Sequence, residues 1–220
     1  MKRLLILGAA NPEIIRLVVR YNDAHPEERW EVAGFLDNNT VLHGTQFMDF
    51  PVLGAPEILR SPEYQDCFVV NNITRDCRTR RQTTEQVLQY TQRFTHLIHP
   101  QVDLLHVKVG IGTVVHEGCI ISSGTEVREH GAIMLGARVG HDCLLGKYVF
   151  IGPSATVLGR VRAGDEVLIG AGAVLYPRVS LGTGAKVAAG AVVTKDVGHG
   201  CLAFGNPARI IAPDTRTEGD

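Results

Sequence analysis

A histidine and an aspartate stand side by side in the segment ARVGHDCLLG, residues 137–146, whose other positions are mostly small or aliphatic. Imidazole titrates near neutral pH, so histidine suits the role of a general base, which typically accelerates a reaction by about 10²–10⁴-fold. A neighbouring carboxylate can orient the ring or stabilise the imidazolium. His141 and Asp142 together therefore predict the removal of a proton from a nucleophile.

The pair lies within a repeat that has a period of six. From Val109 the sequence reads VGIGTV, VHEGCI, ISSGTE, VREHGA, IMLGAR, VGHDCL, LGKYVF and IGPSAT, with an aliphatic first place in each hexad. This period fits neither an α-helix nor a β-hairpin and is typical of a β-helix, in which three hexads make one coil of a triangular prism. His141 and Asp142 are predicted to face outward.

The division into hexads also predicts an interruption of the repeat. The four residues VLGR, 157–160, precede the next hexad, VRAGDE. A break would free backbone groups from the ladder between coils, and we expect a fixed N–H donor for an oxyanion at this place.

The first part of the chain predicts a different architecture. Apolar runs and helical spacing alternate, and Pro12 fits an early helix position. The expected strands are 3–8, 30–39 and 67–73, the expected helices begin near Pro12 and cover 56–60 and 74–93, and LIHP (97–100) is a strand and connector leading out. We predict a Rossmann-like α/β domain over residues 1–95 and a β-helix over residues 96–220.

Composition narrows the classes of protein. Of 220 residues, 45% are hydrophobic and 20% charged, and the net charge of −1 argues against a nucleic-acid surface. No apolar run approaches the length of a membrane span, and Asn11, Pro12 and Glu13 interrupt the apolar start that could be a secretory signal. The five cysteines form no C-x-x-C motif, which favours free thiols and a cytoplasmic location.

The segments LLILGA, GFLDNN, LIHP, VGHDCLLG and FGNPARII resemble the hexapeptide-repeat sugar acetyltransferases. This family includes the sialic acid O-acetyltransferases and the bacterial N-acetyltransferases of nucleotide-linked amino sugars. The resemblance implies a left-handed β-helix that binds acetyl-CoA and an N-terminal domain that binds the sugar nucleotide. It also implies a homotrimer with active sites between subunits. We expect no metal.

The resemblance assigns roles to individual residues. His141 would be the base with Asp142 beside it, and the Gly159 amide would bind the oxyanion. Coenzyme A would run along Gly159, Ala171 and Ala189, and its adenine would lie near Pro207 and Arg209.

The sugar nucleotide would contact Gly8, Ala9, Asn11, Asp37 and Asn38. Here the sequence departs from the family, whose amino-sugar members usually carry G-x-x-G-H-G where this chain has GAANPE. Because proline lacks an N–H donor, phosphate binding at this loop must differ or be absent.

The sequence alone is compatible with several functions. The leading one is N-acetylation of a nucleotide-linked amino sugar for a surface glycan or O-antigen, and the alternatives are O-acetylation of a sialic-acid-like sugar and a non-catalytic scaffold. A zinc site like that of the γ-type carbonic anhydrases is disfavoured, because Gly146 stands where a second histidine is needed. His116 and His130 are expected to serve surface or interface packing.

Overall fold

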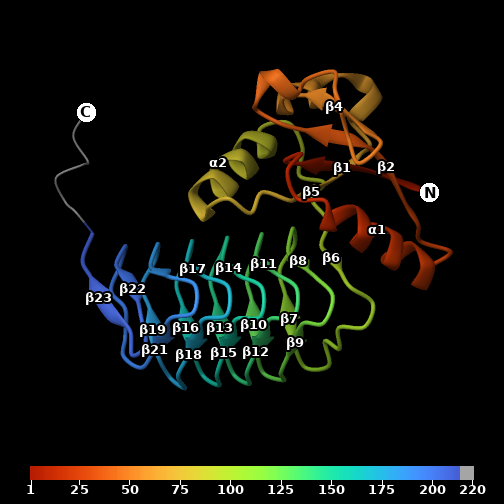
Figure 1. The fold of residues 1–220 in the computed structure, drawn as a ribbon. Coiled ribbons are helices and arrows are strands. Elements are labelled where there is room, and N and C mark those ends of the chain that lie inside the picture. The colour runs from red at the N-terminus through yellow and green to blue at the C-terminus, as the bar shows by residue number, and fades with distance from the viewer. Residues whose placement is uncertain (214–220) are drawn as a thin grey trace.

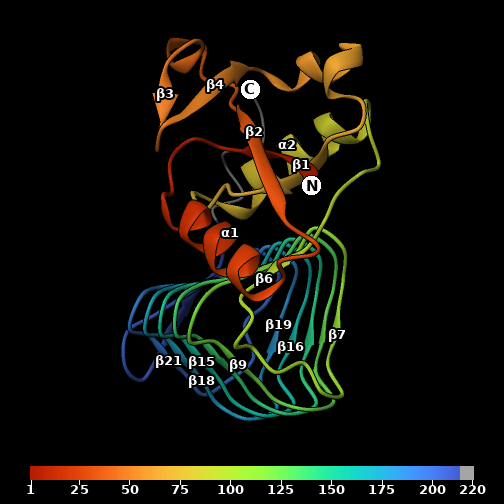
Figure 2. The same cartoon turned by 90° about the vertical axis from the view of Figure 1, so that its right-hand side faces the viewer.

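The computed structural model describes residues 1–213 and shows an α/β part followed by a left-handed β-helix, as predicted (Figure 1). Residues 214–220, which the predicted second unit includes, lie outside the described residues. The α/β part lies along one side of the prism (Figures 1 and 2).

The α/β part is built on a five-stranded sheet of order β3-β4-β2-β1-β5. All pairs are parallel except β3 with β4. Continuous apolar runs place the central strands in the core, as is usual for a sheet covered on both faces. The strands are β1 (Lys2–Leu7), β2 (Trp30–Leu36), β3 (Gln46–Phe47), β4 (Phe50–Gly54) and β5 (Phe68–Asn71).

Two α-helices cover this sheet, α1 (Glu13–Ala24) and α2 (Cys77–Leu88). Pro12 directly precedes α1, and the Asp76 side chain caps α2 by accepting the Thr79 N–H at 2.7 Å. The expected helix over 74–93 is therefore shorter at both ends. Three 3₁₀ turns complete the α/β part: η1 (Thr40–Leu42), η2 (Pro56–Arg60) and η3 (Pro62–Tyr64).

The β-helix consists of two- and three-residue strands that form three parallel sheets. Sheet I contains β6 (Leu97–Ile98), β8 (Val114–Val115), β11 (Ala132–Ile133), β14 (Phe150–Ile151), β17 (Leu168–Ile169), β20 (Lys186–Val187), β22 (Leu202–Phe204) and the antiparallel β23 (Arg209–Ile211). Sheet II contains β9 (Ile120–Ile121), β12 (Arg138–Val139), β15 (Thr156–Val157), β18 (Val174–Leu175) and β21 (Val192–Val193). Sheet III contains β7 (Lys108–Val109), β10 (Glu126–Val127), β13 (Leu144–Leu145), β16 (Arg162–Ala163) and β19 (Ser180–Leu181).

The repeat continues through residues 157–160 without a break, so the predicted interruption is wrong. The strands β15 and β16 keep the spacing of the strands before and after them. The Arg162 N–H joins the ladder by donating to Val179 O at 3.1 Å. The break was predicted because Val161 was taken as the first residue of a hexad. In the structure it is the fifth residue, a place that small and aliphatic residues also occupy.

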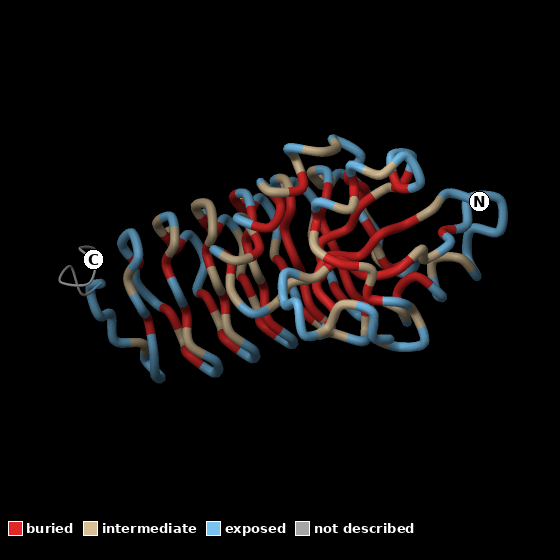
Figure 3. The backbone as a smooth tube through the Cα atoms, turned by 90° about the horizontal axis from the view of Figure 1, so that it is seen from above, coloured by how far each residue is buried: buried red, intermediate tan, exposed pale blue. Residues whose placement is uncertain are grey.

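The prism core follows the repeat as expected. Val139 and Leu145 are 1% and 0% exposed, and the small Cys143 between them is 2% exposed. Successive coils thus bury a continuous column of aliphatic side chains. Figure 3 shows the alternation of buried strands and exposed corners along the chain.

The α/β part rests on sheet I and contacts both edges of that sheet. At the edge between sheets III and I, the buried Arg80 side chain donates to the carbonyls of His130 and Gly131, at 2.8 and 3.2 Å. At the edge between sheets I and II, Arg16 of α1 forms an ion pair with Glu117 at 3.1 Å. The third edge, between sheets II and III, lies opposite the α/β part.

His116 and His130, expected at the surface or in an interface, are buried between the two parts and do not lie at the surface. They are 2% and 6% exposed, and the His130 ring stacks on Tyr148 with a centroid distance of 5.3 Å. Burial, together with the Arg80 cation, lowers the pKa of both histidines to about 4. Both rings are therefore neutral at pH 7.

Candidate active site

His141 and Asp142 lie at the edge between sheets II and III, in the turn from β12 to β13. Both side chains are more than half exposed, and His141 Nδ1 lies 2.9 Å from Asp142 Oδ2. When Nδ1 carries the proton and donates to the carboxylate, Nε2 is left as an acceptor. The turn therefore presents an oriented base on the surface of the prism.

The next coil contributes Arg160, whose Nε lies 3.6 Å from Asp142 Oδ2. The hydrogen bond with His141 and the nearby Arg160 cation hold the pKa of Asp142 below its ordinary value. The Asp142 backbone has φ 57° and its N–H donates to Ser123 O at 3.2 Å. Arg160 was not among the predicted site residues.

Gly159 lies directly beside the imidazole. A Cβ at this position would come within 2.6 Å of His141 Nε2, so any side chain would displace the ring. The flanking amides of Leu158 and Arg160 donate to Leu175 O and His141 O. No hydrogen bond within residues 1–213 uses the Gly159 N–H, although the repeat is unbroken here, because residues at this place of the turn fall between ladder positions.

The residues expected along coenzyme A do not all meet within one chain. Ala171 and Ala189 are exposed and lie in turns between sheets I and II, whereas Gly159 lies between sheets II and III. Pro207 and Arg209 are exposed on the terminal hairpin of β22 and β23.

A cavity of about 380 Å³ opens at the carboxyl ends of β1, β2 and β5, where open α/β sheets usually bind ligands. Of the predicted contacts, Gly8, Ala9, Asp37 and Asn38 line it, and Asn11 does not. Further polar residues that were not predicted line the cavity. Asn39 follows β2, Asn72, Thr74 and Arg75 lie between β5 and α2, and Thr79 and Thr83 lie on α2.

The side chains of Asp37 and Asn11 also accept hydrogen bonds from the backbone in this region. The Asp37 carboxylate accepts the N–H groups of Ala9 at 3.0 Å and Asn39 at 2.8 Å, which ties the loop after β1 to the end of β2. The Asn11 Oδ1 accepts the Glu13 N–H at 3.2 Å at the start of α1. The Asn11 side chain thus occupies a helix N–H that would otherwise be free for an anion.

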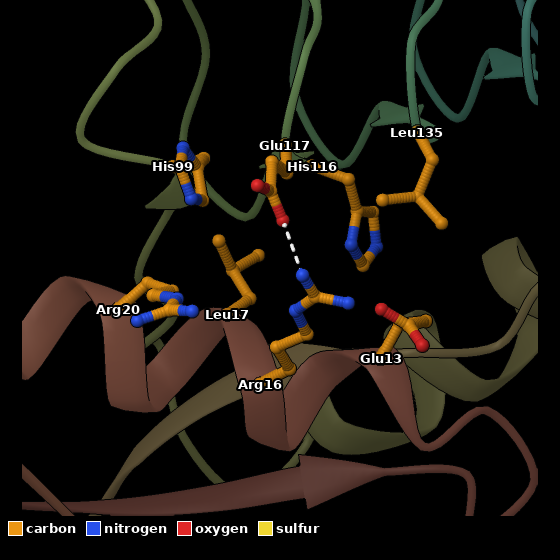
Figure 4. Close-up of a pocket in the computed structure, with 8 residues that line it drawn as sticks. All are labelled: Glu13, Arg16, Leu17, Arg20, His99, His116, Glu117 and Leu135. Atoms are coloured by element: carbon orange, nitrogen blue, oxygen red, sulfur yellow. Dashed lines mark ion pairs between the residues drawn. The ribbon is translucent and has the colours of Figure 1, made fainter.

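A second, much smaller cavity of about 10 Å³ lies between α1 and the β-helix (Figure 4). The Arg16–Glu117 ion pair crosses it, and His116 and His99 line its prism side. This volume admits about one water molecule, which excludes a sugar or a cofactor.

Neither a metal-binding cluster nor a membrane-spanning helix is found among the described residues. The described residues contain no group of three or more histidine, cysteine, aspartate or glutamate side chains placed to hold a metal ion. Within residues 1–213, no helix is both long and apolar enough to cross a membrane.

Two family models match the β-helix. The model of the hexapeptide repeat of succinyl-transferase matches residues 136–177, and the model of the bacterial transferase hexapeptide matches residues 164–195. Among curated proteins, the chain is 32% identical over 111 residues to an acyl-[acyl-carrier-protein]–UDP-N-acetylglucosamine O-acyltransferase of Campylobacter concisus. That match covers 47% of this chain and 42% of the relative, so it spans less than half of that protein.

Solved structures match over nearly the whole chain. The acetyltransferase domain of PglB from Neisseria gonorrhoeae, in complex with acetyl coenzyme A, is 30% identical with a TM-score of 0.82, and the match covers 96% of this chain and 99% of that one. PerB from Caulobacter crescentus, in complex with CoA and GDP-perosamine, is 27% identical with a TM-score of 0.83, covering 96% and 98%. The chain belongs to the hexapeptide-repeat acyltransferase family.

Proposed function

We propose that the protein is an acetyl-CoA-dependent N-acetyltransferase that acts on an amino sugar linked to a nucleotide. The observation that carries this proposal is the hydrogen-bonded pair of His141 and Asp142 beside the open amide of Gly159. The complexes of PglB with acetyl coenzyme A and of PerB with CoA and GDP-perosamine support the choice of substrates.

In this proposal, His141 Nε2 accepts a proton from the acceptor amine as the amine attacks the acetyl carbonyl. Asp142 holds the imidazole through Nδ1 and stabilises the imidazolium that forms. The Gly159 N–H donates to the oxyanion of the tetrahedral intermediate. The imidazolium then returns the proton to the departing thiolate, so the protein ends the cycle unchanged.

The active site would be completed between two copies of the chain. Because His141 lies at the prism edge opposite the α/β part, we expect the α/β cavity of one copy to serve the His141 of another copy. A homotrimer, the assembly that the family resemblance implies, closes such a heterologous contact into a ring. Ala171 and Ala189 of one copy would then face Gly159 of its neighbour, with coenzyme A between them.

The α/β cavity would hold the sugar nucleotide. Its volume lies within the usual range of small-molecule sites, and Arg75 at its lining offers a cation for phosphate. Adenine stacking near Pro207 and Arg209, a cytoplasmic location and a role in surface-glycan synthesis complete the proposal.

The test follows thiol release from acetyl-CoA with a panel of nucleotide-linked amino sugars and with matched sugars that carry only hydroxyl groups. We expect turnover with an amino sugar, and a fall of at least about 100-fold in kcat for His141→Ala, the usual contribution of a general base. Turnover confined to hydroxyl acceptors would instead assign O-acetylation. Full activity of His141→Ala, or no turnover with any acceptor, would refute the proposal.

A further inference from the structure

The Asp142 carboxylate lies between the two neighbouring coils of the β-helix, with space at Gly124 on one side and the Arg160 cation on the other. One coil earlier, Gly124 leaves room for Oδ1, because a Cβ on Gly124 would overlap that oxygen. One coil later, Arg160 Nε lies 3.6 Å from Oδ2. The carboxylate therefore has a neighbour on each side along the prism axis.

These three positions occupy the same place in successive coils. Gly124, Asp142 and Arg160 are eighteen residues apart, which is one coil of three hexads, and all three have a positive φ, of 77°, 57° and 63°. Their equal place in the turn stacks them one above another. The contacts thus follow from the register of the repeat.

A carboxylate in this exposed turn needs such support. The side chains of His141 and Asp142 are 58% and 54% exposed, so solvent weakens the hydrogen bond between them. Water competes for both partners, and rotation of the aspartate would release Nδ1. Arg160 in the following coil and the limited space at Gly124 in the preceding coil restrict that rotation.

We propose that Gly124 and Arg160 are positioning residues, which fix the Asp142 carboxylate against His141 Nδ1 so that Nε2 faces the acceptor amine. The inference rests on the proposed acetyl transfer. The Arg160 cation also favours the ionised carboxylate, so the proton taken from the amine stays on the imidazole and passes from there to the thiolate. Asp142 binds no proton at any step.

The first test compares Arg160→Gln with Arg178→Gln. Arg178 occupies the same place one coil further on, with φ 67°, and forms no ion pair within the described residues. Arg160→Gln should lower kcat roughly 10- to 100-fold while KM for both substrates changes little, as expected when a catalytic group is misplaced. Arg178→Gln should leave kcat unchanged, and Arg160→Lys should recover part of the loss.

The second test compares Gly124→Ala with Gly118→Ala. Both glycines have nearly the same left-handed backbone, φ 77° and 73°, so both variants carry similar strain. A Cβ on Gly118 would meet Gly136 at an ordinary 3.6 Å, whereas one on Gly124 would displace Asp142. We expect equal losses of thermal stability and a fall in kcat for Gly124→Ala alone.

The outcomes separate this inference from the proposed function. An unchanged kcat in both Arg160→Gln and Gly124→Ala, while His141→Ala is inactive, would overturn the positioning role and leave the acetyl transfer intact. A raised KM with kcat retained in Arg160→Gln would also overturn it, because the arginine would then bind a substrate phosphate. Full activity of His141→Ala would instead remove the proposed function itself.

Discussion

The β-helix and the α/β part use their candidate functional residues in different ways. In the β-helix, His141 and Asp142 occupy outward turn positions. The nearby Val139, Cys143 and Leu145 fill the core. In the α/β part, Asp37 lines the cavity and also accepts two backbone N–H groups that hold the loops. In the repeat, the candidate catalytic residues and the residues that stabilise the fold are therefore different side chains. In the irregular loops of the α/β part, Asp37 serves both purposes.

The largest effect expected of a single substitution tests this separation in the β-helix core. Leu145→Ala should lower the free energy of unfolding by about 2–5 kcal/mol, because it leaves a cavity in a column that is 0% exposed at this point. The adjacent Leu144→Ala is the matched control, since Leu144 is only partly buried and faces outward. Urea unfolding of both variants measures the difference, and equal losses would contradict the assigned register.

The interface between the two parts should make stability depend on pH. The pKa values of His116 and His130 fall from 6.5 to about 4 on folding, so below pH 6.5 the unfolded chain binds protons that the folded chain does not. Stability should therefore fall as the pH is lowered from about 6.5 to 4, by on the order of 3 kcal/mol for each histidine.

Melting temperatures measured across this range, with a His116→Gln/His130→Gln variant, check that prediction. The double variant should start from a lower melting temperature at pH 7, because the packing of both rings is lost, and should then decline less steeply with acid. A decline of the same steepness in both proteins would show that other groups control the acid response.

The smallest expected effect tests the double use of residues in the α/β part. Asp37→Asn keeps one side-chain oxygen but cannot accept both backbone N–H groups as a carboxylate does, so we expect a loss of about 1–2 kcal/mol in stability. It should also raise KM for the sugar nucleotide. Asn38→Ala, which removes one exposed hydrogen bond to Gln86, should leave stability nearly unchanged. Loss of substrate affinity without loss of stability in Asp37→Asn would contradict the double role.

The fold was largely predictable because each part has a strong periodic signal. The hexads from Val109 onward gave the β-helix, and the apolar runs gave the central strands of the α/β part. The hairpin of β3 and β4 was not predicted, since Phe47, Pro51 and Val52 form runs too short to show alternation. The phase after Val157 was misread because Ala, Val and Leu fit both the first and the fifth places of a hexad.

The candidate site was predictable where its residues are neighbours in the chain. His141 and Asp142 are adjacent, and their hydrogen bond is present in the structure. Gly124 and Arg160 were not predicted, although each lies eighteen residues, or one coil, from Asp142. The wrongly predicted break at 157–160 hid this spacing for Arg160, whereas for Gly124 the predicted phase was already correct. Thr79 and Thr83 line the cavity only because α2 docks beside β5, and no local pattern encodes that contact.

The sequence by itself determined the six-residue period, the identity of the inward residues and the pairing of an imidazole with a carboxylate, because these depend on side chains close together in the chain. Only the tertiary structure decided that the repeat is unbroken, that the α/β part covers sheet I, and that His141 lies at the opposite edge. The physical reason is that stacking of coils and docking of domains are set by packing between residues far apart in sequence, which a local pattern does not record.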